Sequence, residues 1–210
     1  MNTMGKDRKA LILEVAERHF AVDGFAGASL SAIARDCELG NAGLLHHFAS
    51  KELLYRALLE AHGQNLMQRM DALLAHAAPP DQLAGFIALQ LDWMRDCPTA
   101  AQLITRELLD NSERIAKAQP RPLERFLNAA LTLLEDGQRT GQLRRDLPAL
   151  ALLTMVLGSL NYAHIVRPTF ERAFADPALA DETAWMQGMA THVLQLLAPA
   201  SGAASDTAAR

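Results

Sequence analysis

The sequence lacks the features that mark a disulfide-stapled or strand-rich protein. It has only two cysteines in 210 residues, Cys37 and Cys97, and aromatic residues make up 5% of it. Neither cysteine belongs to a Cys-x-x-Cys pair or to a spacing typical of zinc ligands, so both are expected to be core residues of a reduced protein. No alternating run of β-branched residues flanks an Asn-Gly or Asp-Gly turn. These absences favour an all-α fold.

The chain also lacks a strong net charge of either sign. Its formal charge of -4 offers no general attraction for nucleic acid, so any DNA-binding surface must be local. The first twenty residues do not form a signal-peptide core, because Glu14, Glu17 and Arg18 interrupt their apolar run. We therefore expect a cytoplasmic protein.

One segment, residues 147–166, lacks any Asp, Glu, Lys or Arg. Its length is sufficient to cross a bilayer. However, it carries Asn161 and His164, and it is the only such segment in a chain of otherwise amphipathic pattern. A helix buried on most sides is the interpretation that we favour over a membrane span.

Apolar residues recur at three- and four-residue steps through almost the whole chain, which predicts helices throughout. The first helix is expected to end at Gly24, and Ser29 and Ser50 are suitable N-caps for later helices. Prolines and glycines mark most of the remaining breaks. The further helices are predicted at about residues 30–37, 41–47, 51–77, 81–96, 99–111, 123–140, 147–166 and 181–197.

Two short helices joined by a three-residue turn, behind a longer first helix, are typical of a helix-turn-helix at residues 29–48. Their apolar positions form matching faces that would hold the two helices crosswise. Between Glu38 and Glu52 the chain has no acidic residue, so the outer face of the second helix could approach a nucleic acid backbone. The apolar positions are Leu30, Ile33, Ala34, Cys37, Leu39, Leu44 and Phe48.

The stretch ILEVAERHFAVDGFAGASLSAIARDCELGNAGLLHHFASKELLYRALLE resembles the DNA-binding domain of the TetR family of bacterial transcriptional regulators. About ten positions agree at fixed spacing, over residues 6–66. The resemblance implies an all-α fold with a second helical domain at residues 67–198, which binds a small-molecule effector and forms a homodimer. It further implies that the protein binds a palindromic operator in double-stranded DNA and leaves it when the effector binds. A repressor is expected more than an activator. The residues 199–210 are expected to be a disordered tail.

The sequence departs from the family at four positions around the turn. Glu38 stands where glycine is usual, so it must accept a backbone conformation that glycine adopts more easily. Gly40 replaces the usual Ser or Thr cap, Asn41 replaces a common basic residue, and Leu45 replaces a frequent phosphate-binding tyrosine. The contacts of this protein with DNA should therefore differ from those of most relatives.

His46 and His47 admit several interpretations. Neighbouring residues on a helix diverge by about 100°, and no Asp, Glu or Cys lies at ligand spacing, so neither a metal site nor a catalytic pair is expected. They are either solvated helix ends or DNA contacts, and we favour contact by at least one of them. No catalytic residue, metal or cofactor is predicted. The predicted DNA-binding residues are Ser29, Leu30, Gly40, Asn41, Ala42, Gly43, Leu45, His46, His47 and Lys51.

Polar and large apolar side chains on the C-terminal helices are candidates for effector binding. For each aromatic residue or methionine, plain core packing is the competing interpretation, and Asn161 and His164 could equally bond across a dimer. Residues 147–166 and the last helix are the expected dimer interface, with Gly158 allowing close approach. The effector candidates are Trp93, Met94, Arg106, Phe126, Met155, Asn161, Tyr162 and His164.

Together these features predict a ligand-responsive transcriptional regulator that acts as a homodimer. The alternative is a helical protein-interaction or adaptor module whose N-terminal unit does not bind DNA. An enzyme is a third and weaker possibility, because no group of residues with catalytic spacing supports it.

Overall fold

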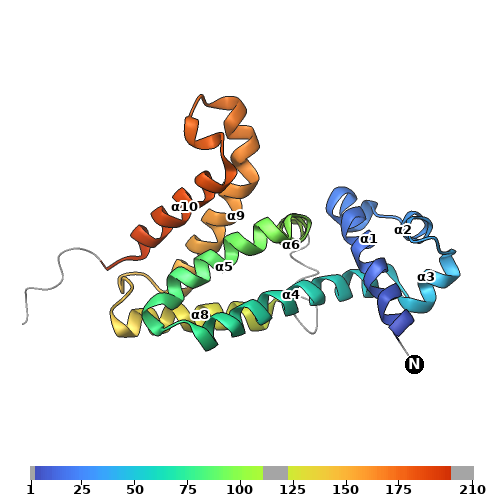
Figure 1. The fold of residues 1–210 in the computed structure, drawn as a ribbon, viewed down its shortest axis with the longest axis horizontal. Coiled ribbons are helices and arrows are strands. Elements are labelled where there is room, and N and C mark those ends of the chain that lie inside the picture. The colour runs from blue at the N-terminus through green and yellow to red at the C-terminus, as the bar shows by residue number, and fades with distance from the viewer. Residues whose placement is uncertain (1–2, 111–122, 200–210) are drawn as a thin grey trace, which may run out of the picture. The chain divides into compact units, whose positions relative to one another are not determined.

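The computed structural model describes residues 3–110 and 123–199, and every element of regular structure in them is helical. The predicted all-α fold is therefore confirmed (Figure 1). The segment 111–122 and the predicted disordered tail beyond residue 199 lie outside the described residues. The elements are α1 (Thr3–Gly27), α2 (Leu30–Asp36), α3 (Asn41–His47), α4 (Lys51–His76), η1 (Pro79–Asp81), α5 (Gln82–Asp96), α6 (Pro98–Asp110), α8 (Glu124–Thr140), α9 (Ala149–Ala173), η2 (Pro177–Leu179) and α10 (Glu182–Leu197).

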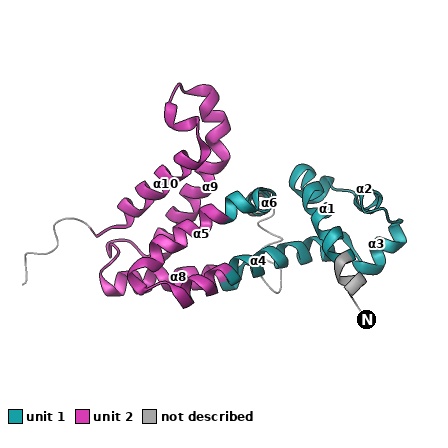
Figure 2. Ribbon diagram, in the orientation of Figure 1, with its two compact units in different colours: residues 1–68, 93–125 teal, residues 69–92, 126–210 magenta. Residues whose placement is uncertain are grey.

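The chain forms two compact units (Figure 2). Unit 1 comprises residues 1–68 and 93–125, and unit 2 comprises residues 69–92 and 126–210. Helices α4 and α5 each begin in one unit and end in the other. Unit 1 thus contains α6 as well as α1 to α3, a grouping that the sequence did not anticipate.

The core of unit 1 is built on α1. Its apolar positions recur at helical spacing and are almost completely buried against α2, α3 and α4. The ring of Phe20 lies edge-on to that of Tyr55, with centroids 4.8 Å apart. Burial of each large apolar side chain in this core stabilises the fold by about 1.5–3 kcal/mol. The largest fully buried members are Ile12, Phe20, Ile33, Leu44, Leu54, Leu58 and, from α6, Leu103.

The predicted boundaries of the first helices are confirmed. Gly24 has a φ of 69° and breaks the helical path of α1 where the sequence predicted its end. Ser29 has an extended backbone and caps α2, with its Oγ accepting from the Ala32 amide at 3.4 Å. Helix α3 then spans Asn41–His47, as predicted.

The turn between α2 and α3 forces Glu38 into the left-handed region, with a φ of 55°. The backbone amide of Leu39 donates to the Ala34 carbonyl at 2.8 Å, and this bond across Glu38 ends α2. A side chain in that conformation is strained, which confirms that Glu38 occupies a position suited to glycine. Gly40 precedes α3 without any side-chain cap.

Unit 2 buries apolar side chains on α5, α8, α9 and α10. Leu134, Leu152, Val156 and Leu160 are completely buried, and α9 packs along α10 (Figure 1). The side-chain amide of Gln138 donates to the carbonyls of residues 144 and 147, which holds the connection between α8 and α9. This connection therefore depends on a side chain and not on regular structure.

The predicted end of the long apolar helix at residue 166 is wrong. Helix α9 continues through Pro168 to Ala173. A proline removes one backbone hydrogen bond, but Arg167 donates to the Leu179 carbonyl at 2.8 Å and to Glu171 at 3.2 Å, and these bonds hold the helix across that point. By length and composition α9 is the one described helix that could cross a membrane, and 33% of its apolar window is buried in the structure.

Replacement of Glu38 by glycine should stabilise the protein. A left-handed non-glycine residue costs about 1–2 kcal/mol, and the extra chain entropy of glycine offsets about half of that, so we expect a gain of about 0.5–1 kcal/mol. Urea denaturation of the two proteins measures it. Glu38→Ala removes the charge but keeps the strain, so a comparable gain in that control would show that charge, not backbone conformation, is responsible.

Candidate nucleic-acid interface

Helix α3 presents one continuous face to solvent. Asn41, Ala42, Leu45 and His46 are exposed, whereas Leu44 is completely buried. The exposed positions follow the i, i+4 spacing of one helix face. The buried side thus anchors α3 to the core and leaves the side that carries the predicted contacts free.

The side-chain amide of Asn41 forms a hydrogen bond within the helix-turn-helix motif. Its Nδ2 donates to the Oγ of Ser31 at 3.0 Å and so links α3 to α2. The side-chain oxygen of Asn41 keeps its acceptor capacity for an outside partner. The sequence did not single out Ser31, because nothing in the spacing of residues 31 and 41 indicates that the two side chains meet.

The two histidines lie close together at the end of α3. Their ring centroids are 5.6 Å apart and their planes are inclined by 69°. His46 is exposed and His47 is half-buried. No group of three His, Cys, Asp or Glu side chains in the described part of the chain is arranged to hold a metal ion.

Lys51 has a structural role that the sequence did not indicate. Its ammonium donates to the carbonyls of Ala26 at 3.1 Å and Ala28 at 2.8 Å, and it lies 4.8 Å from the centre of the Phe25 ring. It therefore holds the turn after α1 against the start of α4. An ammonium has three donors, so one is left for a further partner. Backbone acceptors leave no trace in a sequence, which is why this role escaped prediction.

Two basic residues of the first helix, Arg8 and Lys9, lie beside the motif. Arg8 donates to the Cys37 carbonyl at 3.4 Å, at the end of α2. The Lys9 ammonium lies 5.9 Å from the centre of the Phe48 ring, at the end of α3. Positive charge is thus placed beside both helices of the motif, although the chain as a whole is acidic.

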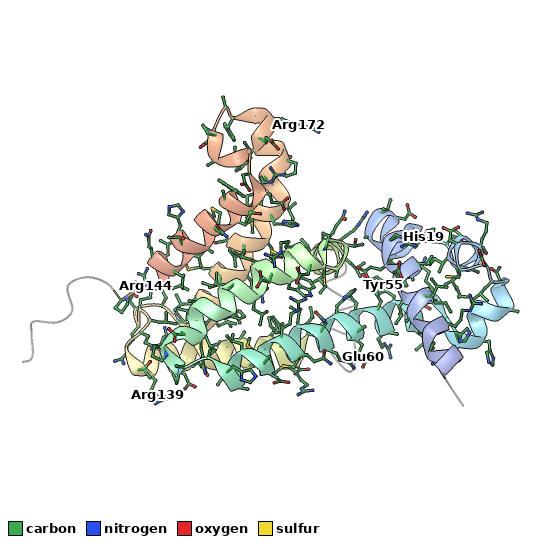
Figure 3. All side chains as sticks on the ribbon, viewed as in Figure 1. His19, Tyr55, Glu60, Arg139, Arg144 and Arg172 are labelled. Atoms are coloured by element: carbon green, nitrogen blue, oxygen red, sulfur yellow. The ribbon has the colours of Figure 1, made fainter. Side chains whose placement is uncertain are left out.

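A histidine and an aspartate connect α1 to α2. His19 lies 2.8 Å from the Asp36 carboxylate, and its position in unit 1 is marked in Figure 3. The hydrogen bond from His19 lowers the pKa of Asp36 below its usual value. The carboxylate therefore stays ionised to lower pH than a free aspartate, and this contact is lost only as the pH falls through the lowered pKa.

Arg106 joins α6 to the end of α1. Its guanidinium donates to the carbonyls of Val22 at 2.8 Å and Ala21 at 3.2 Å. Gly24 has a positive φ that strains any other residue, and a Cβ added there would lie 3.2 Å from the Arg106 Nε, so the arginine would have to shift. Arg106 was predicted as an effector ligand, and the structure gives it a place in the packing of unit 1.

The effector candidates are divided between the two units. Trp93, Met94 and Arg106 belong to unit 1, and the other five belong to unit 2. Tyr162 is 64% exposed, and the amide of Asn161 donates to a carbonyl of its own helix at 2.7 Å. The predicted effector residues therefore do not share one unit. The unit 2 candidates are Phe126, Met155, Asn161, Tyr162 and His164.

Some buried donors lack a partner among the described residues. They include the Nε1 of Trp93 and the Nε2 of Gln90. Gln90 is only 4% exposed, and the sequence did not single it out. Buried donors normally have an acceptor, so each of these atoms is a candidate for bonding a ligand.

Comparison with known proteins identifies the class of protein. Residues 12–58 match the model of bacterial regulatory proteins of the tetR family, and residues 79–197 match the tetracyclin repressor-like C-terminal domain. The transcriptional regulator RutR of Escherichia coli (strain K12) is 27% identical over 180 residues, which cover 86% of this chain and 84% of RutR. UidR of the same organism is 24% identical over 199 residues, covering 90% and 92%.

Solved structures show the same architecture. A candidate transcriptional regulator of Streptomyces coelicolor superposes with a TM-score of 0.72 at 25% identity, covering 90% of this chain and 97% of that one. FadR of Bacillus subtilis, in complex with stearoyl-CoA, superposes with a TM-score of 0.71 at 17% identity, covering 90% and 97%. Because the C-terminal family model alone matches more than half of the chain, the protein belongs to the TetR family. It is a DNA-binding transcriptional regulator.

Removal of the Arg106 guanidinium should destabilise the protein. Hydrogen bonds to a charged group contribute about 1.5–3 kcal/mol each when buried, and partial exposure reduces this, so Arg106→Met should cost about 1–2 kcal/mol in urea denaturation. Arg139→Met is the matched control, because the Arg139 side chain is 74% exposed and pairs with Asp136 on its own helix. Equal effects of the two substitutions would contradict the role assigned to Arg106.

Proposed function

We propose that the protein is a cytoplasmic repressor that binds a palindromic operator as a homodimer and releases it when a small molecule binds. The observation that carries the proposal is the exposed face of α3, which is free of acidic residues and anchored by a buried leucine. In a helix-turn-helix the second helix enters the major groove, while the first crosses the backbone. A regulator that is not itself an enzyme fits these features.

The proposed base contacts come from α3. Asn41, His46 and His47 carry hydrogen-bonding groups, and Ala42 and Gly43 allow the backbone to approach the groove. Gly40 has open space around its Cα, since a Cβ built there meets no atom within 4 Å. Residues outside α3 would face the phosphates and set the register. These are Ser29, Leu30 and Lys51.

The proposed partner for α9 and α10 is a second copy of this chain. Large apolar side chains on α9 are exposed, among them Leu150 at 60%, Tyr162 at 64% and Ile165 at 49%. Gly158 lies on the same stretch, and a Cβ there would meet no atom within 4 Å, so a partner helix has room to approach. Apolar stripes of this kind mark contact surfaces, and homodimers use the same patch twice.

The proposed effector is a mainly apolar small molecule that offers a hydrogen-bond acceptor. The Nε1 of buried Trp93, which has no acceptor among the described residues, supports this choice of an acceptor. Bacillus subtilis FadR is solved in complex with stearoyl-CoA, and AibR with isovaleryl coenzyme A and operator DNA, so two proteins of this fold bind molecules that carry an apolar acyl chain. Arg106 offers a route to the DNA-binding helices, because it bonds α6 to the end of α1.

Binding to DNA is tested by selection from a random pool of duplexes, followed by titration at several salt concentrations. We expect an enriched inverted repeat whose affinity falls by about 10³-fold between 50 and 200 mM salt if about six phosphates are contacted. His46→Ala or His47→Ala should weaken binding by about 5- to 100-fold without lowering the melting temperature. The adaptor alternative would be supported by a pool without enrichment and an affinity without salt dependence.

The dimer is tested on α9. Ile165→Asp places a charge in the proposed apolar contact and should convert dimer to monomer in sedimentation equilibrium, while the secondary structure is kept. Leu74→Asp, on α4, is the control, because Leu74 has a similar exposure of 39% and lies outside the proposed surface. A dimer that survives Ile165→Asp would place the interface elsewhere.

A further inference from the structure

Leu45 is an apolar residue on the exposed face of α3, among neighbours that can form hydrogen bonds with DNA. Leu45 is 42% exposed. With about 100° per residue, it lies about 40° around the helix from Asn41 and about 100° from His46, near the middle of the exposed arc. Single exposed leucines are common and carry no meaning by themselves. Its central position on the exposed face is what requires an explanation.

The surroundings of Leu45 leave it accessible to a large partner. Ala42, one turn earlier on the same face, has a short side chain, and Gly40 has open space around it. Asn41 is held to one side by its bond to Ser31. Neither Ala42 nor Gly40 therefore blocks the approach of a groove to the side chain of Leu45.

We propose that Leu45 recognises the C5-methyl group of a thymine in the operator, an inference that rests on the proposed function. The methyl of thymine is the one apolar group on the major-groove edges of the four unmodified bases. Leucine has no donor or acceptor, so it gains nothing from a phosphate or from a polar base edge and would strip water from both. Leu45 would thus contact a base, whereas relatives with tyrosine at this position contact a phosphate of the DNA.

The restricted amide of Asn41 strengthens the assignment. Reading adenine through its N6 and N7 requires both the oxygen and a free N–H of the amide in one plane. One N–H of Asn41 is already donated to Ser31 at 3.0 Å, which limits how the amide can turn towards a base. Asn41 is therefore restricted in reading an A·T pair, and the apolar contact of Leu45 would distinguish thymine by its methyl group.

The test begins on the DNA, with the unmodified full-length protein. Each thymine of the selected palindrome is replaced in turn by deoxyuridine, symmetrically in both half-sites, and the affinity is measured by fluorescence anisotropy. Deoxyuridine removes the methyl and leaves base pairing intact. One position should lose about tenfold in affinity, because burial of a methyl corresponds to about a three- to fivefold effect in each half-site.

The protein side of the test asks whether Leu45 is responsible. Leu45→Ala should weaken binding to the thymine duplex by about tenfold or more and should bind the thymine and uracil duplexes equally at the sensitive position. Leu45→Met keeps an apolar side chain and should keep a preference for thymine. Leu127→Ala is the control, because Leu127 is 38% exposed on α8 and should change neither affinity.

The different failures are distinguishable. A random pool that yields no enriched duplex overturns the proposed function itself. A palindrome that binds with the expected salt dependence but tolerates uracil at every thymine overturns only the role of Leu45. That role is likewise overturned if Leu45→Ala still discriminates against uracil at the sensitive position.

Discussion

The burial of Leu44 and Ile33 against α1 is the constraint on which the function depends. Both side chains are completely buried in the core that contains Phe20. Helices α2 and α3 have seven residues each and are too short to be stable alone. Their tertiary packing fixes both the helices and their crossing, and the exposed face of α3 is a consequence of it.

Strain and polar contacts then set the ends of these helices. Glu38 adopts a left-handed conformation because the packed helices leave only a short turn between them. The bonds of Lys51, Arg8 and Arg106 all end on backbone carbonyls at the ends of helices, where such acceptors are otherwise unsatisfied. Charged residues that could serve the proposed DNA surface thus also help to hold the domain together, and in our proposal α3 supplies the specificity.

The two units differ in how their functions are encoded. In unit 1 the outward residues of α3 follow directly from helical spacing, because a single buried face defines the opposite one. In unit 2 the candidates lie on two helices, α8 and α9, and Tyr162 and Met155 prove to be exposed on α9 instead of buried within the unit. Periodicity cannot distinguish a core from an interface, since both are apolar stripes. The buried Nε2 of Gln90, which lacks a partner among the described residues, could be found only once its surroundings were known.

Helical period, caps and breaks are local properties, so the amino-acid sequence was sufficient to locate most helices, the helix-turn-helix and the strained turn at Glu38. It predicted a break at Pro168 that α9 does not make: the proline removes one backbone bond, and Arg167 adds bonds to the Leu179 carbonyl and to Glu171 beside it. Only the folded chain shows that Arg106 bonds to α1 and that Asn41 bonds to Ser31. Those contacts join residues 10 or more positions apart, and no local pattern records which distant groups packing brings together.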